Sequence, residues 1–140
     1  MNLEIDRRVV FAATGGKEHG PNQPLIVFLH GAGMDHSVWA LQSRWFAHHG
    51  GNVLAVDLPG HGRSAGPPLT DIASLADWTE RLIAGICCDR ASLVGHSMGA
   101  HCGRDRGASS GPVSEPLSHW RFRKNAGSSR PARRGEGQFA

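Results

Sequence analysis

The stretch Leu93–Gly99, L-V-G-H-S-M-G, decides the expected fold of this chain. It contains the pattern G-x-S-x-G, with Ser97 between Gly95 and Gly99, at the end of an apolar run over 91–94. A nucleophilic serine has to protrude from a sharp turn between a strand and a helix, and that turn leaves no room for a Cβ two residues before or after it. The pattern therefore predicts a buried strand, an exposed serine and a helix behind it.

Other apolar runs precede this stretch at intervals that leave room for helices. The continuous run L-I-V-F-L over 25–29 is typical of a strand buried on both faces, as in a parallel sheet. Strands that alternate with helices predict an α/β fold with a doubly wound, mostly parallel sheet. We expect strands near 3–12 (one or two edge strands), 25–29, 53–56 and 91–94, and helices near 37–49 and 70–86.

Each expected helix has a capping residue and an apolar stripe. Asp35 or Ser37 can cap the first helix, and Thr70 or Asp71 can cap the second. The stripe at helical spacing is expected to face the sheet in both cases. It consists of Val38, Leu41, Trp45 and Phe46 in the first helix, and of Ile72, Leu75, Trp78, Leu82, Ile83 and Ile86 in the second.

Two more motifs follow apolar runs. H-G-A-G begins at His30, directly after the run 25–29, and D-L-P-G-H-G-R-S begins at Asp57, directly after 53–56. With G-H-S-M-G, these motifs in this order resemble the α/β-hydrolase superfamily with a serine nucleophile. The resemblance covers residues 1–100, which look like the N-terminal half of that domain, and it implies a partial α/β-hydrolase fold truncated after the nucleophile elbow.

The resemblance implies a role for each matching position. Ser97 would be the nucleophile, and the backbone N–H groups of Ala32 and Met98 would form the oxyanion hole. His30 would brace its loop, and Asp57 would hold the loop that it begins. The positions that support the motifs are His30, Gly31, Gly33, Asp57, Gly95, His96 and Gly99.

The sequence departs from the family after the elbow. The family places a catalytic acid and then a histidine in later strand-end loops. No such pair is recognisable here, because Asp105, Glu115 and Glu136 follow no strand and His101 and His119 are poorly placed. A serine without a base is a poor nucleophile. We expect a serine hydrolase acting on an ester, lactone or similar acyl bond, inactive as this chain; the alternatives are a non-catalytic hydrolase fragment or a binding protein on the same scaffold.

Residues 101–140 differ in composition from the rest of the chain. They are rich in Gly, Ser, Arg and Pro and carry eight Lys/Arg and three Asp/Glu, whereas residues 1–100 carry seven and nine. This composition predicts a disordered tail without a stable core from about residue 103. One hypothesis is that the tail is an out-of-frame translation, since a shifted reading frame allows an amphipathic helix from Ala100 onward.

Composition also limits the cellular setting and the partners. The three cysteines, Cys87, Cys88 and Cys102, form no disulfide framework and favour a reducing compartment, so we expect a cytoplasmic protein. The N-terminus has no apolar signal region, and no apolar run is long enough to span a membrane. We expect a small-molecule acyl substrate, no cofactor, no metal, no nucleic acid and no membrane as partners; the sequence leaves the oligomeric state open.

Overall fold

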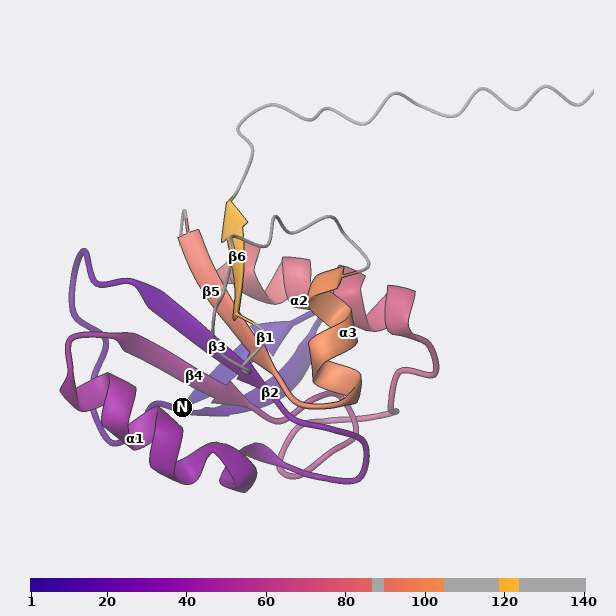
Figure 1. The fold of residues 1–140 in the computed structure, drawn as a ribbon. Helices are drawn as coiled ribbons and strands as arrows, with labels where there is room; N and C mark the ends of the chain where they lie inside the picture. The colour runs from indigo at the N-terminus through magenta and orange to yellow at the C-terminus, as the bar shows by residue number, and fades with distance from the viewer. Residues whose placement is uncertain (87–89, 105–118, 124–140) are drawn as a thin grey trace, which may run out of the picture.

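The computed structural model describes residues 1–86, 90–104 and 119–123. These residues form a six-stranded mixed sheet in the order β1-β2-β4-β3-β5-β6 (Figure 1). The strands are β1 (Asn2–Ile5), β2 (Arg8–Ala13), β3 (Leu25–Leu29), β4 (Asn52–Val56), β5 (Arg90–Gly95) and β6 (His119–Arg123). The helical elements are the 3-10 helix η1 (His36–Trp39) and the α-helices α1 (Ala40–His48), α2 (Ile72–Gly85) and α3 (Met98–Arg104).

The centre of the sheet is parallel and its flanks are antiparallel. β3 pairs in parallel with both β4 and β5, whereas β1, β2 and β6 pair antiparallel with their neighbours. The run 25–29 is buried at every position, as expected of a central strand covered on both faces. The α/β class and the partial hydrolase-type sheet are therefore confirmed, and the edge region 3–12 divides into a hairpin of two strands.

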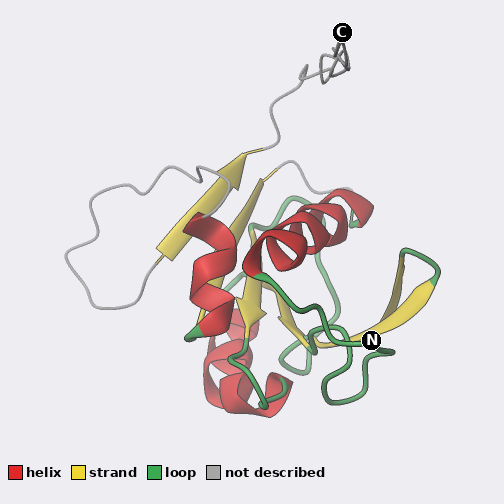
Figure 2. Ribbon diagram, turned by 90° about the vertical axis from the view of Figure 1, so that its right-hand side faces the viewer, coloured by secondary structure: helices red, strands yellow, loops and turns green. Residues whose placement is uncertain are grey.

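Two apolar layers cover the sheet, one on each face. Successive residues of β3 point to opposite faces, so that Val27 packs toward α2 and α3, while Phe28 packs toward η1 and α1. Figure 2 shows the helices on both sides of the strands. The second expected helix is confirmed: Asp71 is its N-cap, and its buried face includes Leu75, Trp78, Leu82 and Ile83.

The face predicted for the first helix is wrong in part: Phe46 packs against the core cluster that contains Phe28, but the other three residues of the stripe are exposed. Leu41 and Trp45 are 82% and 55% exposed, whereas Ser43 and Ala47 are buried against the sheet side. The backbone of Ser43 and the Cβ of Ala47 lie so close to Gly15 that a side chain at Gly15 would collide with them. The close approach of the helix to this loop requires small residues at positions 43 and 47, and Leu41 and Trp45 are left outside.

The structure also differs from the expectation for the tail. Residues 119–123 form β6, which pairs antiparallel with β5 from His119↔Val94 to Arg90↔Arg123. The sequence H-W-R-F-R alternates polar and apolar residues, as a strand on a sheet edge does. Pairing with β5 supplies backbone partners that composition alone does not reveal. The expected disorder of 105–118 and 124–140, and the positions of Cys87 and Cys88, lie outside the described residues.

Candidate active site

Three loops begin together at the carboxyl edge of the parallel strands. The register aligns Leu29 with Val56 of β4 and with Gly95 of β5, so the motifs that start at His30 and Asp57 and the elbow leave the sheet side by side. The N–H of His96 donates to the carbonyl oxygen of Leu29 at 3.0 Å, which ties the elbow to β3. Ligands of open α/β sheets bind at this edge, where the strands end.

Ser97 stands on a strained turn between β5 and α3. Its φ is 52°, in the left-handed region that side chains rarely adopt, and the residue is exposed. A Cβ at Gly95 would collide with the backbone of Gly99 and Ala100, and a Cβ at Gly99 would collide with the carbonyl oxygen of Leu29. The two glycines of the pattern are therefore required by close backbone approach, as the sequence predicted.

The H-G-A-G loop lies against this turn. A Cβ built on Gly31 would lie 3.4 Å from the Cβ of Ser97 and 3.0 Å from the Nδ1 of His96. Gly33 turns the loop with a φ of 70°. Among the described residues, the backbone N–H of Ala32 has no hydrogen-bond acceptor. The same holds for Met98, the first residue of α3, whose N–H has no intrahelical partner.

His30 is buried and joins two of the three loops. Its Nδ1 donates to the carbonyl oxygen of Gly31 at 2.8 Å, and its Nε2 accepts from the N–H of Leu58 at 3.0 Å. These two partners assign a neutral ring with the proton on Nδ1. Burial lowers the pKa of His30, which favours the same neutral form. Both ring nitrogens are occupied, so this histidine is not available to deprotonate a nearby serine.

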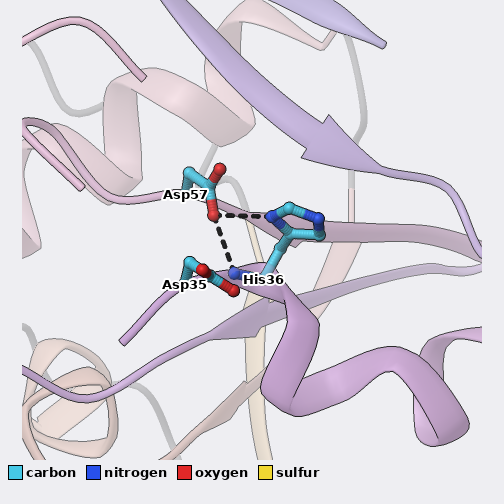
Figure 3. A group of neighbouring side chains, drawn as sticks. All are labelled: Asp35, His36 and Asp57. Atoms are coloured by element: carbon cyan, nitrogen blue, oxygen red, sulfur yellow. Dashed lines mark hydrogen bonds and ion pairs between the residues drawn. The ribbon is translucent and has the colours of Figure 1, made fainter. Parts of the chain in front are cut away.

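Asp57 is fully buried and holds the loops together through its carboxylate (Figure 3). Oδ1 accepts from the backbone N–H of His36 at 2.7 Å and from its Nδ1 at 2.8 Å, and Oδ2 accepts from the N–H of Arg63 at 2.8 Å. Sequence reasoning missed His36 as a partner, because it lies 21 residues from Asp57 and belongs to no motif. The only local signal was Asp57 itself: an acid directly after a buried strand is expected to be buried too, and a buried carboxylate needs hydrogen-bond donors.

Asp35, His36 and Asp57 have ligand atoms within 4.8 Å of one another. Their hydrogen bonds already use the atoms that a cation would need. Asp35 accepts from the N–H of Ser37 at 2.8 Å as the N-cap of η1, and hydrogen bonds from Ser37 lower the pKa of Asp35. Since His36 donates its Nδ1 proton to Asp57, the arrangement in Figure 3 acts as a brace between two loops.

No described residue forms a hydrogen bond with the Ser97 hydroxyl. His61 directs its Nδ1 to the carbonyl oxygen of Pro59 at 3.0 Å, and His101 is exposed on α3. The side chain of His119 lies outside the part that the structure describes. The arrangement within the described residues thus combines an exposed, strained serine with two free backbone donors, but without a paired base.

The comparisons with known proteins agree with this geometry. The family model for the alpha/beta hydrolase family matches residues 26–138. The chain is 33% identical over 84 residues to (E)-2-((N-methylformamido)methylene)succinate hydrolase of Acinetobacter baylyi, covering 59% of this chain and 31% of that protein. It is 38% identical over 89 residues to a 2-hydroxy-6-oxononadienedioate/2-hydroxy-6-oxononatrienedioate hydrolase of Paraburkholderia phymatum, covering 59% of this chain and 30% of that protein.

A solved structure agrees as well. The enol-lactonase from Burkholderia xenovorans superimposes with a TM-score of 0.67 at 29% identity, covering 77% of this chain and 41% of that chain. The chain belongs to the α/β-hydrolase family. It spans about a third of the length of the curated relatives named here.

Proposed function

We propose that this chain carries the nucleophile and oxyanion half of a serine hydrolase that acts on an ester, lactone or similar acyl bond. The observation that carries the proposal is the left-handed φ of 52° at Ser97, beside a loop whose Gly31 approaches its Cβ. Strain of this kind persists where the surrounding structure holds it, and it concentrates at active sites. The enol-lactonase with the same fold supports acyl chemistry of this class.

In this reaction the Oγ of Ser97 bonds to the acyl carbon and the carbonyl oxygen becomes an oxyanion. The N–H groups of Ala32 and Met98 would stabilise that charge, and each such donor typically contributes about 3–4 kcal/mol to the transition state. The hydroxyl proton of Ser97 passes to solvent, the bond to the leaving alkoxide breaks, and the alkoxide takes a proton from solvent. Water then releases the acid from the serine. No cofactor takes part in these steps, and the substrate is a small molecule in the cytoplasm.

The proton of the Ser97 hydroxyl has no acceptor among the described side chains. We therefore propose that this chain turns over an activated ester far more slowly than a complete serine hydrolase. Oxyanion stabilisation alone can leave a residual rate about 10³-fold above that in water, provided the fold is intact. The missing base is also the observation that favours the second candidate function, a non-catalytic fragment or binding protein on this scaffold.

The test compares the native chain with Ser97→Ala and with Ser37→Ala, which removes another exposed serine. Burst and steady-state hydrolysis of an activated acyl ester are measured, and a fluorophosphonate probe reports labelling of the serine. We expect weak labelling and slow turnover that disappear in Ser97→Ala and persist in Ser37→Ala.

Three other results would each contradict one part of the proposal: the role of Ser97, the presence of any catalysis, or the absence of a base. Equal residual hydrolysis in the native chain and in Ser97→Ala would exclude Ser97 as the nucleophile. Absence of both labelling and hydrolysis in the folded native chain would favour the non-catalytic alternative. Turnover at ordinary enzyme rates would show that a base exists, and His61, His101 and His119 would then be replaced in turn.

A further inference from the structure

A cavity of about 220 Å³ lies between the β1–β2 hairpin, α2 and the loop 59–69. It is remote from the elbow, because β4 and β3 separate β2 from β5 in the sheet order. Its lining has one residue in common with the loops described above, Pro59, whose carbonyl oxygen accepts from His61. The volume is below the ~300–1,000 Å³ of pockets that hold drug-sized ligands, so its occupant would be small.

The floor of the cavity is apolar. Ile5 and Val10 come from the hairpin and Trp78 comes from α2, and all three are largely buried in the core, at 7%, 2% and 4% exposure. Leu69 closes the floor from the loop side. Such a floor favours a ligand with an aromatic or aliphatic body, which loses contact with water when it binds.

The rim of the cavity is basic and has unused hydrogen-bond donors. Arg8 donates from one guanidinium nitrogen to the carbonyl oxygen of Gly66 at 3.1 Å, and Arg81 donates from Nε to Asp6 at 2.9 Å. A guanidinium has five N–H donors, so each arginine keeps several for a ligand. The pair of Arg81 and Asp6 is about half exposed at both ends, and such pairs contribute little to stability and can exchange partners.

A further donor belongs to the floor itself. Trp78 is only 4% exposed and lines the cavity, and its side chain carries an indole N–H donor. An indole N–H is a hydrogen-bond donor, so an acceptor on the ligand can pair with it. The donor lies with the two guanidinium groups around one cavity, and all three favour a ligand that accepts hydrogen bonds.

The walls of the cavity are fixed in advance of binding. The N–H of Ala65 donates to the carbonyl oxygen of Val9 at 2.9 Å, and the N–H of Phe11 donates to the Oγ of Ser64 at 2.9 Å. These bonds attach the loop 59–69 to β2 at two neighbouring points. A preformed cavity requires little ordering of the protein when a ligand binds.

We propose that this cavity binds a small carboxylate with an apolar body. The carboxylate pairs with the guanidinium groups of Arg81 and Arg8, and the body lies on the floor beside Trp78. Planar guanidinium groups bind carboxylates through paired hydrogen bonds, which distinguishes this class from a neutral ligand of the same shape. Asp6 competes with the ligand for Arg81, so removal of its charge strengthens binding.

The experiment titrates the native chain with benzoate and, in parallel, with benzamide, which has nearly the same shape but no charge. Binding is followed by two-dimensional amide and indole N–H spectra, in which the Trp78 indole signal reports the cavity. We expect saturable binding of benzoate with a shift of the Trp78 signal. Arg81→Gln weakens it about tenfold or more, as for the loss of a hydrogen bond to a charged group.

The matched control is Arg44→Gln, which removes the same charge from α1 on the opposite face of the sheet and leaves benzoate binding unchanged. Asp6→Asn tightens benzoate binding and leaves benzamide unaffected, a result that a purely structural role for Asp6 does not produce. Equal losses in Arg81→Gln and Arg44→Gln, equal binding of benzamide, or shifts centred on the elbow would each overturn the proposal. Ser97→Ala binds benzoate as the native chain does, so this test is independent of the hydrolase function.

Discussion

The buried carboxylate of Asp57 offers a direct test of how the loops after β3 and β4 are held together. Its two oxygens accept from two donors of His36 and from the N–H of Arg63, at 2.7–2.8 Å. A hydrogen bond to a charged group contributes about 1.5–3 kcal/mol, and a donor left without a partner in a partly buried site costs a similar amount. Replacement by alanine removes all three acceptor interactions at once.

We expect Asp57→Ala to lower the free energy of unfolding by about 3–5 kcal/mol, because water can reach some of the released donors. This is a large share of the ~5–15 kcal/mol that stabilises a typical domain. Asp57→Asn keeps one acceptor oxygen for His36 but turns an amide toward the N–H of Arg63. It should therefore cost about 1.5–3 kcal/mol.

The assay is urea unfolding followed by tryptophan fluorescence, with the midpoint and slope fitted for each variant. Asp71→Asn is the matched control, since Asp71 is an exposed N-cap that accepts from Ser74 and asparagine caps a helix equally well. Its midpoint should stay within error of the native chain. If Asp57→Asn shifts the midpoint no more than Asp71→Asn, the carboxylate does not brace the loops and the reasoning fails.

Two further predictions concern the elbow and the buried histidine. Gly99→Ala should lower the free energy of unfolding by more than about 2 kcal/mol in the same urea assay, because the new Cβ collides with the carbonyl oxygen of Leu29. The control is Gly85→Ala, whose Cβ meets only the flexible end of Ile5 at 3.3 Å, and it should be neutral within error. Burial lowers the pKa of His30 in the folded protein, so the unfolded chain binds more protons than the folded chain as the pH falls. The stability due to neutral His30 is therefore present above about pH 6.5 and is lost below it. The decline in unfolding free energy between pH 7 and 5 should be smaller in His30→Gln, and an unchanged slope would contradict the assignment.

Much of the local structure could be predicted from the sequence. The run 25–29 is too short and too uniformly apolar for anything but a buried strand, and Asp71 precedes a clear helical stripe. The glycines around Ser97 also indicated the elbow, because backbone geometry there admits no other residue. These features depend on neighbours within a few positions in the chain.

The inner face of α1 and the strand β6 could not be predicted in this way. The apolar spacing of Leu41 and Trp45 fits a helix stripe, yet the close approach of α1 to Gly15 puts Ser43 and Ala47 inside. The strand over 119–123 pairs with an edge of β5 that is distant in sequence. The buried face of α1 depends on its contact with the loop at Gly15, and the formation of β6 depends on its pairing with β5.

The sequence by itself determined the order of strands and helices as far as β5, the elbow at Ser97 and the loops that begin at His30 and Asp57, because periodicity and steric limits act locally. Only the tertiary structure decided which groups meet there. The register of β3 with β4 and β5 brings three loops to one edge and joins Asp57 to His36. The packing of the β1–β2 hairpin against α2 and the loop 59–69 encloses the cavity beside Trp78. These contacts join residues far apart in the chain, and their geometry follows from strand pairing and packing rather than from any local pattern.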